Sequence, residues 1–235
     1  MGQEKGTGAS PMNFENYPIY IIHYTPLKER KIFLNEQLKR EALYEKTHWI
    51  ENFDRETITE WPELELSSNE LSKGVIAVNM AHSYALEKIA ESSEGYGLIL
   101  EDDVVLKKNS KALIQKYCNA IPDNWDMISI GSACGFHIPF WRRRPGKHVY
   151  LKENTKTRWG GDGATRCADS YFVSSKGAKL LLSSRAMQRP FLKPIDWALN
   201  EAIRDKNLNV YWMEPTVAHQ GSQSGHFEGG SYRLG

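Results

Sequence analysis

Apolar and polar positions along the chain follow two periods, and their order predicts strands and helices in alternation. Short apolar runs bounded by turn residues are typical of buried strands, whereas apolar residues three and four apart are typical of helices. The predicted strands are Ile19–Ile22, His48–Phe53, Leu98–Leu100, Asp126–Ile130, Ser170–Ser174 and Asn209–Met213. The first predicted helix is capped by Thr25 and begins at Pro26. The other predicted helices are Leu71–Ala90, Asn109–Ala120, Lys176–Ser183 and Ile195–Lys206.

This alternation predicts an α/β domain with a mostly parallel central sheet flanked by helices. We expect one domain over residues 16–220, after a flexible tail over residues 1–15 and before a flexible segment or lid over residues 221–235. The poorly patterned stretch from Gly131 to Ala168 is typical of a functional loop region or a small subdomain. Ligands of such sheets collect at the carboxyl ends of the strands.

Composition and charge exclude several other classes of protein. The 235 residues are 40% hydrophobic, with 30 Lys and Arg against 29 Asp and Glu, as in an ordinary globular protein. A net charge of +1 argues against a nucleic-acid partner, and no apolar run approaches the roughly 18 residues of a membrane span. Cys118, Cys134 and Cys167 lack CxxC spacing, so we expect reduced thiols and a cytoplasmic location.

An acidic triplet, Glu101-Asp102-Asp103, directly follows the apolar run Leu98–Leu100. Like charges this close repel and raise one another's pKa unless a cation compensates them. Mn²⁺ or Mg²⁺ fits such a site, because these ions accept one or two carboxylates and keep positions open for phosphate oxygens. The triplet alone is equally compatible with a solvated turn that caps the next helix.

Short motifs around this triplet follow one another in a distinctive order. They are Tyr20–His23, Glu29–Lys31, Leu71–Gly74, Met80–His82, Leu98–Val104, Ser170–Ser174 with Gly177-Ala178, Pro194–Asp196, and Tyr211 with Pro215 and Gln220. In this order the sequence resembles glycosyltransferase family 25, the lipooligosaccharide-biosynthesis and collagen galactosyltransferase type that also occurs in large DNA viruses. His23 stands where that family usually has Asn, and Ala81 where it usually has Ser, which leaves the donor sugar open.

The resemblance implies a GT-A fold and a metal-dependent, inverting transfer of a sugar. The expected donor is a nucleotide diphosphate sugar such as a UDP-hexose, and the expected acceptor is a carbohydrate or another hydroxyl compound. It implies that Asp103 ligates Mn²⁺ or Mg²⁺ and that Glu101 and Asp102 face the ribose and base. It also implies that Asp196 is the general base, although an acid at a helix start is common in itself. By analogy with this fold, His219 completes the metal ligands.

Four more residues are candidates for binding the donor, two of them with a structural alternative. Tyr24 and Arg30 follow the first strand, where a uracil-type base and diphosphate lie in this fold. Arg30 pairs either with phosphate or with a neighbouring carboxylate. Asn79 and His82 are three apart on one helix face and can reach the donor together, but His82 can equally be a buried, hydrogen-bonded core residue.

The acceptor side is expected in the poorly patterned region. Trp141-Arg142-Arg143-Arg144, with Trp159, Gly161 and Asp162, combines stacking groups and charge, although such a basic run is more often a solvated loop. The segment from Gly221 to Gly230 is either a lid over the donor or a frayed end.

Two other functions stay open. A sugar nucleotidyltransferase should have a Gly-rich loop after its first strand, but Tyr24-Thr25-Pro26 contains no glycine. A catalytically silent domain that binds carbohydrate or nucleotide sugar need not keep both the acidic triplet and Asp196. The expected partners are therefore a nucleotide-sugar donor and a hydroxylated acceptor, without nucleic acid or a membrane span.

Overall fold

The computed structural model describes residue 14 and residues 16–58, 71–118, 120–132, 138, 140–152 and 168–227. Its central sheet has seven strands in the order β2-β1-β3-β7-β5-β8-β6. The bounds are β1 Ile19–Ile22, β2 Thr47–Ile50, β3 Tyr96–Glu101, β5 Met127–Ser129, β6 Val149–Leu151, β7 Ser170–Ser174 and β8 Val210–Met213. Five strands share one direction and only β6 and β7 oppose it, which confirms the predicted α/β class with a mostly parallel sheet.

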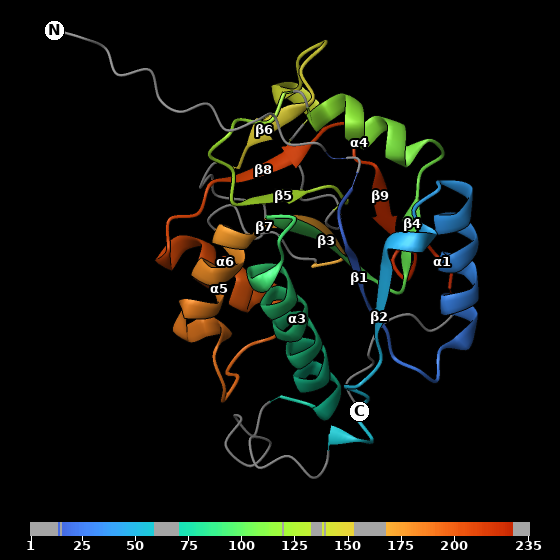
Figure 1. The fold of residues 1–235 in the computed structure, drawn as a ribbon, viewed down its shortest axis with the longest axis vertical. Coiled ribbons are helices and arrows are strands. Elements are labelled where there is room, and N and C mark those ends of the chain that lie inside the picture. The colour runs from blue at the N-terminus through green and yellow to red at the C-terminus, as the bar shows by residue number, and fades with distance from the viewer. Residues whose placement is uncertain are drawn as a thin grey trace, which may run out of the picture.

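Helices cover both faces of this sheet (Figure 1). Their bounds are α1 Lys28–Arg40, α3 Lys73–Glu91, α4 Ser110–Cys118, α5 Ser175–Ser183 and α6 Ile195–Asp205, with short 3-10 turns η1 Tyr44–Lys46, η4 Phe140–Arg142 and η5 Arg185–Met187. None of these helices combines the length and the apolar character that crossing a membrane requires.

Alternation along β3 divides the core in two. Leu98 and Leu100 point to one face and pack with Leu34 of α1 and Ile114 of α4, whereas Ile99 points to the other face and packs with residues of α3, α5 and α6. Successive side chains of a strand alternate between faces, so a continuous apolar run is what a strand covered on both sides needs. This burial fixes where β3 ends, and therefore where the acidic triplet lies.

A two-stranded antiparallel sheet, β4 (Val104–Leu106) with β9 (Ala218–Gln220), lies beside α1 (Figure 1). The pattern of apolar and polar positions did not predict these two strands or β6, because runs of three residues seldom show a period. The pairing matters for the site, because it brings the end of the described chain against the residues that follow β3.

Two sequence predictions are wrong in detail. The first helix begins at Lys28 without a side-chain cap, because the Thr25 hydroxyl and backbone N–H both donate to the Asp54 carboxylate. Phe14, assigned to the tail, is only 4% exposed and packs against Tyr96 and Phe172. Residues 1–13 of that tail lie outside the described residues, and so do Cys134 and Cys167, while Cys118 is a free thiol.

Candidate functional site

The acidic triplet stands at one edge of the sheet, where parallel strands end together. Glu101 is the last residue of β3 and is in register with Ile22, the last residue of β1. Asp102 and Asp103 form the turn into β4. Three carboxyl groups thus leave the sheet where its parallel strands finish, the edge at which such sheets bind ligands.

Asp102 is bonded within the protein. Its carboxylate accepts from His23 Nδ1 at 2.8 Å, from Arg30 Nη1 at 2.9 Å and from the Tyr24 backbone N–H at 3.3 Å, and the residue is 5% exposed. These bonds tie the end of β1 and the first turn of α1 to the end of β3. Of the two partners expected for Arg30, the structure shows the neighbouring carboxylate.

Asp103, the next residue, differs from Asp102. It is 3% exposed, and Oδ2 accepts a hydrogen bond from the Ser222 hydroxyl. Oδ1 is buried and has no hydrogen-bond partner among the described residues. Burial raises the pKa of this carboxyl, and the neighbouring charge of Asp102 raises it further. The arrangement therefore leaves one buried acceptor atom unfilled.

Glu101 receives hydrogen bonds from both sides of the site. His82 Nε2 lies 3.3 Å from Oε1, and Gln220 Nε2 on β9 lies 3.5 Å from Oε2. Burial raises the pKa of Glu101 well above its usual value, and the charges of Asp103, Asp102 and Asp196 add to this. A raised pKa favours the protonated carboxyl, which can donate a hydrogen bond as well as accept one.

His82 is the buried, hydrogen-bonded histidine that the sequence left as an alternative, but it also touches the site. Burial lowers its pKa to about 3, so the ring is neutral at physiological pH. Burial also raises the pKa of Tyr171, whose hydroxyl lies 3.0 Å from Nδ1 and keeps its proton. If the Tyr171 hydroxyl donates to Nδ1, then Nε2 carries the ring proton and donates it to Glu101.

A fourth carboxyl, Asp169, was missed in the sequence. It is 1% exposed, accepts from the Ser170 hydroxyl at 2.9 Å, and its carbonyl accepts from the Glu101 N–H at 2.8 Å. Burial and the charge of Glu101 raise its pKa to about 8. A Cβ on Gly131 would lie 2.3 Å from Asp169 Oδ2, so only glycine leaves room for this carboxyl. No motif marks Asp169, because only the antiparallel pairing of β3 with β7 brings it here.

A cavity of about 200 Å³ opens beside Glu101 and brings three of the predicted site residues together. It is lined by Val75, Val78, Asn79, Glu101, Ala168, Pro194, Ile195, Asp196, Gln220 and Gln223. Asp196 stands in the first turn of α6, as predicted, and Oδ1 accepts from the Trp197 backbone N–H at 3.0 Å.

Asn79 holds the chain that leads to Asp196. Its amide Nδ2 donates to the Lys193 carbonyl at 2.8 Å, which ties α3 to the approach to α6. Its Oδ1 is buried without a hydrogen-bond partner among the described residues. Asn79 therefore fixes one wall of the cavity and leaves an acceptor atom there.

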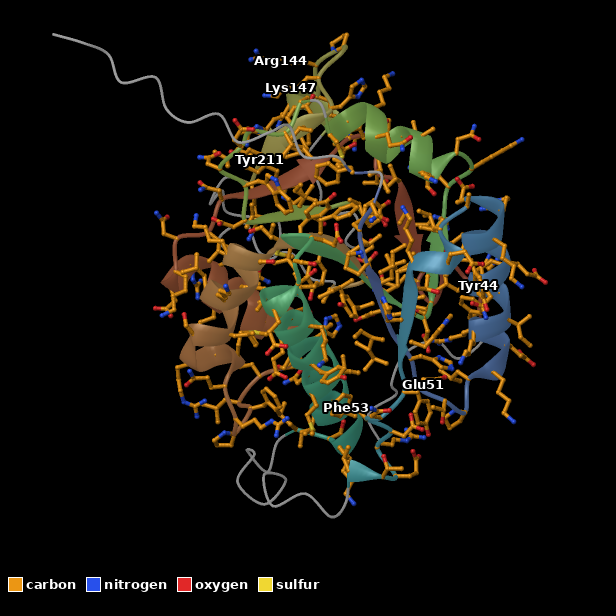
Figure 2. All side chains as sticks on the ribbon, in the orientation of Figure 1. Tyr44, Glu51, Phe53, Arg144, Lys147 and Tyr211 are labelled. Carbon is orange, nitrogen blue, oxygen red and sulfur yellow. The ribbon has the colours of Figure 1, made fainter. Side chains whose placement is uncertain are left out.

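Tyr24 lies at a second, small hollow of about 10 Å³ that also contacts Phe53, Arg55 and Val78. Its hydroxyl donates to Glu56 at 2.6 Å, and the Arg55 guanidinium lies over its ring. Glu51 and Phe53, which are labelled in Figure 2, follow the end of β2 and show where this hollow lies. Val78 lines both hollows, so they are neighbours across one residue of α3.

His219 and the basic run are not hydrogen-bonded to the acidic triplet within the described residues. His219, on β9 opposite Val105, makes no hydrogen bond to a carboxylate within the described ranges. Burial lowers its pKa, as do the charges of Lys107 and His226. Arg144 lies at the opposite end of the molecule from Glu51 and Phe53 (Figure 2). Trp159, Gly161 and Asp162 lie outside the described residues.

The segment after β9 packs on α1. The Gly221 N–H donates to the Asp103 carbonyl at 2.7 Å, and the Phe227 ring meets Phe33 edge-on with the Arg30 guanidinium over it. The segment that was expected to be a lid or a frayed end is described as far as residue 227. Residues 221–227 form turns that cover Asp103 and reach Arg30, and residues 228–235 lie outside the described residues.

No group of three or more His, Cys, Asp or Glu side chains in the described part of the chain is arranged to hold a metal ion. A cation that takes most of its ligands from a diphosphate needs fewer, because Mg²⁺ commonly uses one or two carboxylates together with phosphate oxygens. The unfilled Oδ1 of Asp103, in a cluster where several pKa values are raised, fits such a cation.

Comparison with known proteins identifies a family and similar solved structures. Residues 16–197 match the model of glycosyltransferase family 25, described as LPS biosynthesis protein. The crystal structure of mouse xyloside xylosyltransferase 1, apo form, is similar with 11% identity and a TM-score of 0.37, over 83% of this chain and 77% of that chain. No curated protein sequence matches.

Proposed function

Since the chain belongs to glycosyltransferase family 25, we propose that it moves a sugar from a nucleotide diphosphate sugar, such as a UDP-hexose, to a carbohydrate or other hydroxyl acceptor. One observation carries this proposal beyond the family. Glu101 and Asp196 line the same cavity, and Glu101 also feels the charge of the buried Asp103. An acid that can hold a cation and an acid that can take a proton are the two groups that such a transfer needs.

Asp103 would hold Mn²⁺ or Mg²⁺ through its unfilled Oδ1, with His219 proposed as a further ligand. When bound, the cation would neutralise charge on the nucleoside diphosphate as it leaves. Asp102 acts indirectly, because its bonds to His23 and Arg30 hold the turn in which Asp103 stands.

Donor binding divides among the other predicted residues. Glu101 faces the cavity and would contact hydroxyl groups of the donor, while Tyr24, at the second hollow, would contact the base. Arg30 and Asp102, predicted to touch the donor, are proposed here as positioning residues, because they already bond each other. His82 is a positioning residue for Glu101.

Asp196 would act as the general base. Its carboxylate takes the proton of the acceptor hydroxyl as that oxygen bonds the anomeric carbon, and the bond from the sugar to phosphate breaks with release of the nucleoside diphosphate. Attack opposite the leaving group inverts the anomeric centre. The start of α6 favours the ionised carboxylate, and Asn79 fixes the approach to this helix. Trp197 and Leu192, 47% and 55% exposed near Asp196, would meet the acceptor.

The test is a transfer assay with a panel of nucleotide sugars, which measures release of the nucleoside diphosphate and the anomeric configuration of the product by NMR. Asp196→Asn should lower transfer by roughly 10²- to 10⁴-fold while nucleotide binding is kept. Asp123→Asn, an exposed acid in a distant turn, is the matched control and should transfer normally. Normal transfer by Asp196→Asn would remove it as the base, and binding without turnover by the wild type would indicate the silent domain.

A further inference from the structure

The basic segment that the proposed site does not use forms a distinct surface at residues 140–152, which we name the basic tip. It carries Arg142, Arg143, Arg144, Lys147 and Lys152 and no Asp or Glu, in a chain of net charge +1. Trp141, near its start, is 73% exposed, the largest exposure among the exposed large apolar side chains of the described residues. A large aromatic ring and a concentration of positive charge are thus presented together.

The backbone of the basic tip is held in place. Residues 144–147 form a turn in which the Lys147 N–H donates to the Arg144 carbonyl at 3.1 Å, and Gly146 has a φ of 77° that favours glycine. The Arg144 N–H donates to the hydroxyl of Tyr150 at 2.8 Å, and Tyr150 is itself buried with Ile138 and Trp212. The turn therefore has a defined shape before any partner arrives.

Within the described residues, Arg144 and Lys147 at the end of the tip form no ion pair with an acid. Arg143 lies 3.4 Å from the buried Glu214 carboxylate, which secures it to the body of the protein. The Arg144 guanidinium has no hydrogen bond or ion pair within the described residues, and the Lys147 ammonium lies over the Tyr150 ring. Arg144 and Lys147 stand at one extreme of the molecule, away from Glu51 and Phe53 (Figure 2).

We propose that the basic tip docks this protein on the surface of an anionic lipid bilayer. Tryptophan is favoured at membrane interfaces because its ring is apolar while its N–H stays wet, and Arg and Lys beside it attract anionic headgroups. A single-stranded nucleic acid is a poorer fit, because it needs several aromatic faces along a basic groove, and Trp141 is the one exposed tryptophan of this described segment.

The binding is weak and reversible. A Lys or Arg close to an anionic surface strengthens binding about fivefold, so a few such residues and one ring give transient attachment rather than permanent anchoring. The tip lies at the other end of the molecule from the end of β2, so docking leaves the second hollow, at Phe53, facing away from the membrane.

Co-sedimentation with vesicles tests this proposal. The wild type should pellet with vesicles of phosphatidylcholine and phosphatidylglycerol, but not with phosphatidylcholine alone, and added salt should release it. Arg144→Glu combined with Lys147→Glu should weaken binding by more than about tenfold, and Trp141→Ala should weaken it less. Lys28→Glu combined with Lys179→Glu, the same charge change at exposed sites elsewhere, should bind like the wild type.

Three results would overturn the proposal. They are no binding of the wild type to either kind of vesicle, equal loss in the control double variant, or binding to a single-stranded oligonucleotide that anionic vesicles do not compete away. Thermal unfolding of each variant shows whether it is folded. Hydrolysis of the nucleotide-sugar donor without an acceptor is measured in parallel and should be unchanged in the tip variants, because no tip residue lines the cavity beside Glu101, so failure of this proposal and failure of the proposed function are distinguishable.

Discussion

The chain contains one acidic triplet, Glu101-Asp102-Asp103, and one basic triplet, Arg142-Arg143-Arg144. The fold largely buries the acidic triplet and leaves the basic one in an exposed turn region. Asp102 and Asp103 are 5% and 3% exposed, and the pKa values of Glu101 and Asp103 are raised by burial. The arginine triplet belongs to an exposed turn region, where Arg143 pairs with the buried acid Glu214. Charge density by itself therefore does not identify a site.

The difference lies in what each triplet lacks. The buried acids lack positive charge, since Arg30 is the cation bonded to them and Asp103 keeps an unfilled oxygen. In the exposed turn region, water can solvate the charges of the arginines. A buried cluster of one sign calls for a small ion that enters the protein, whereas an exposed cluster meets a large charged surface from outside.

The largest effect should follow from Asp103→Asn, which removes the charge but keeps the shape. We expect transfer to fall on the order of 10³-fold, because an amide neither neutralises nor holds a divalent cation well. Without metal, the variant should be at least as stable as the wild type, because a buried carboxyl with a raised pKa is gone. Transfer assays and urea unfolding measure the two effects, and a variant that is merely unfolded would contradict this account.

Asp102→Ala should act on stability. It leaves His23 and Arg30 without the carboxylate that they share, and breaking a buried ion pair commonly lowers the free energy of unfolding by about 3–5 kcal/mol. Urea denaturation measures the loss, with the exposed Asp123→Ala as control, expected within about 0.5 kcal/mol of the wild type. Equal unfolding midpoints for the two variants would show that Asp102 does not hold the turn.

Asp169 predicts a pH dependence of defined sign. Its pKa is raised from 3.8 to about 8 by burial, so between these values the folded state binds more protons than the unfolded state. Its contribution to stability is therefore present at acid pH and is lost as the pH rises through about 8. Asp169→Asn should flatten this decline when the unfolding free energy is measured from pH 4 to pH 8 without metal. Parallel pH profiles for variant and wild type would exclude this role.

The smallest effects are expected in the basic triplet. Arg144→Ala should change the free energy of unfolding by less than about 0.5 kcal/mol, because it is an exposed substitution that removes no bond made by its side chain within the described residues. Arg143→Ala should lose more, about 1–3 kcal/mol, because the Glu214 carboxylate stays buried. Thermal or urea unfolding of both variants decides whether the two arginines differ.

The strand at Leu98–Leu100 and the position of the acids after it could be predicted from the sequence. A strand buried on both faces must be apolar throughout, and the charged residues mark its end. The sequence also placed Asp196 at a helix start, from the proline before an amphipathic segment. These features depend on neighbours in the chain, and therefore on patterns that a sequence displays directly.

Features that depend on strand order were beyond the sequence. Asp169 reaches Glu101 because β7 runs antiparallel to β3, with Leu100 opposite Ser170. Gln220 reaches Glu101 through the short pair of β4 and β9. Phe14 belongs to no periodic pattern, and its ring contacts with Tyr96 and Phe172, which are distant in the chain, explain its burial. Pairings between distant segments leave no local period from which to predict them.

The central claim is that the acids at the end of β3 bind a divalent cation together with a nucleoside diphosphate. Calorimetric titration of the protein with UDP, in Mn²⁺ and then in EDTA, tests it most directly. The account predicts binding with Mn²⁺ that EDTA abolishes, that Asp103→Asn loses and that Asp196→Asn keeps. Binding that is equal with and without metal, or unchanged in Asp103→Asn, would contradict it.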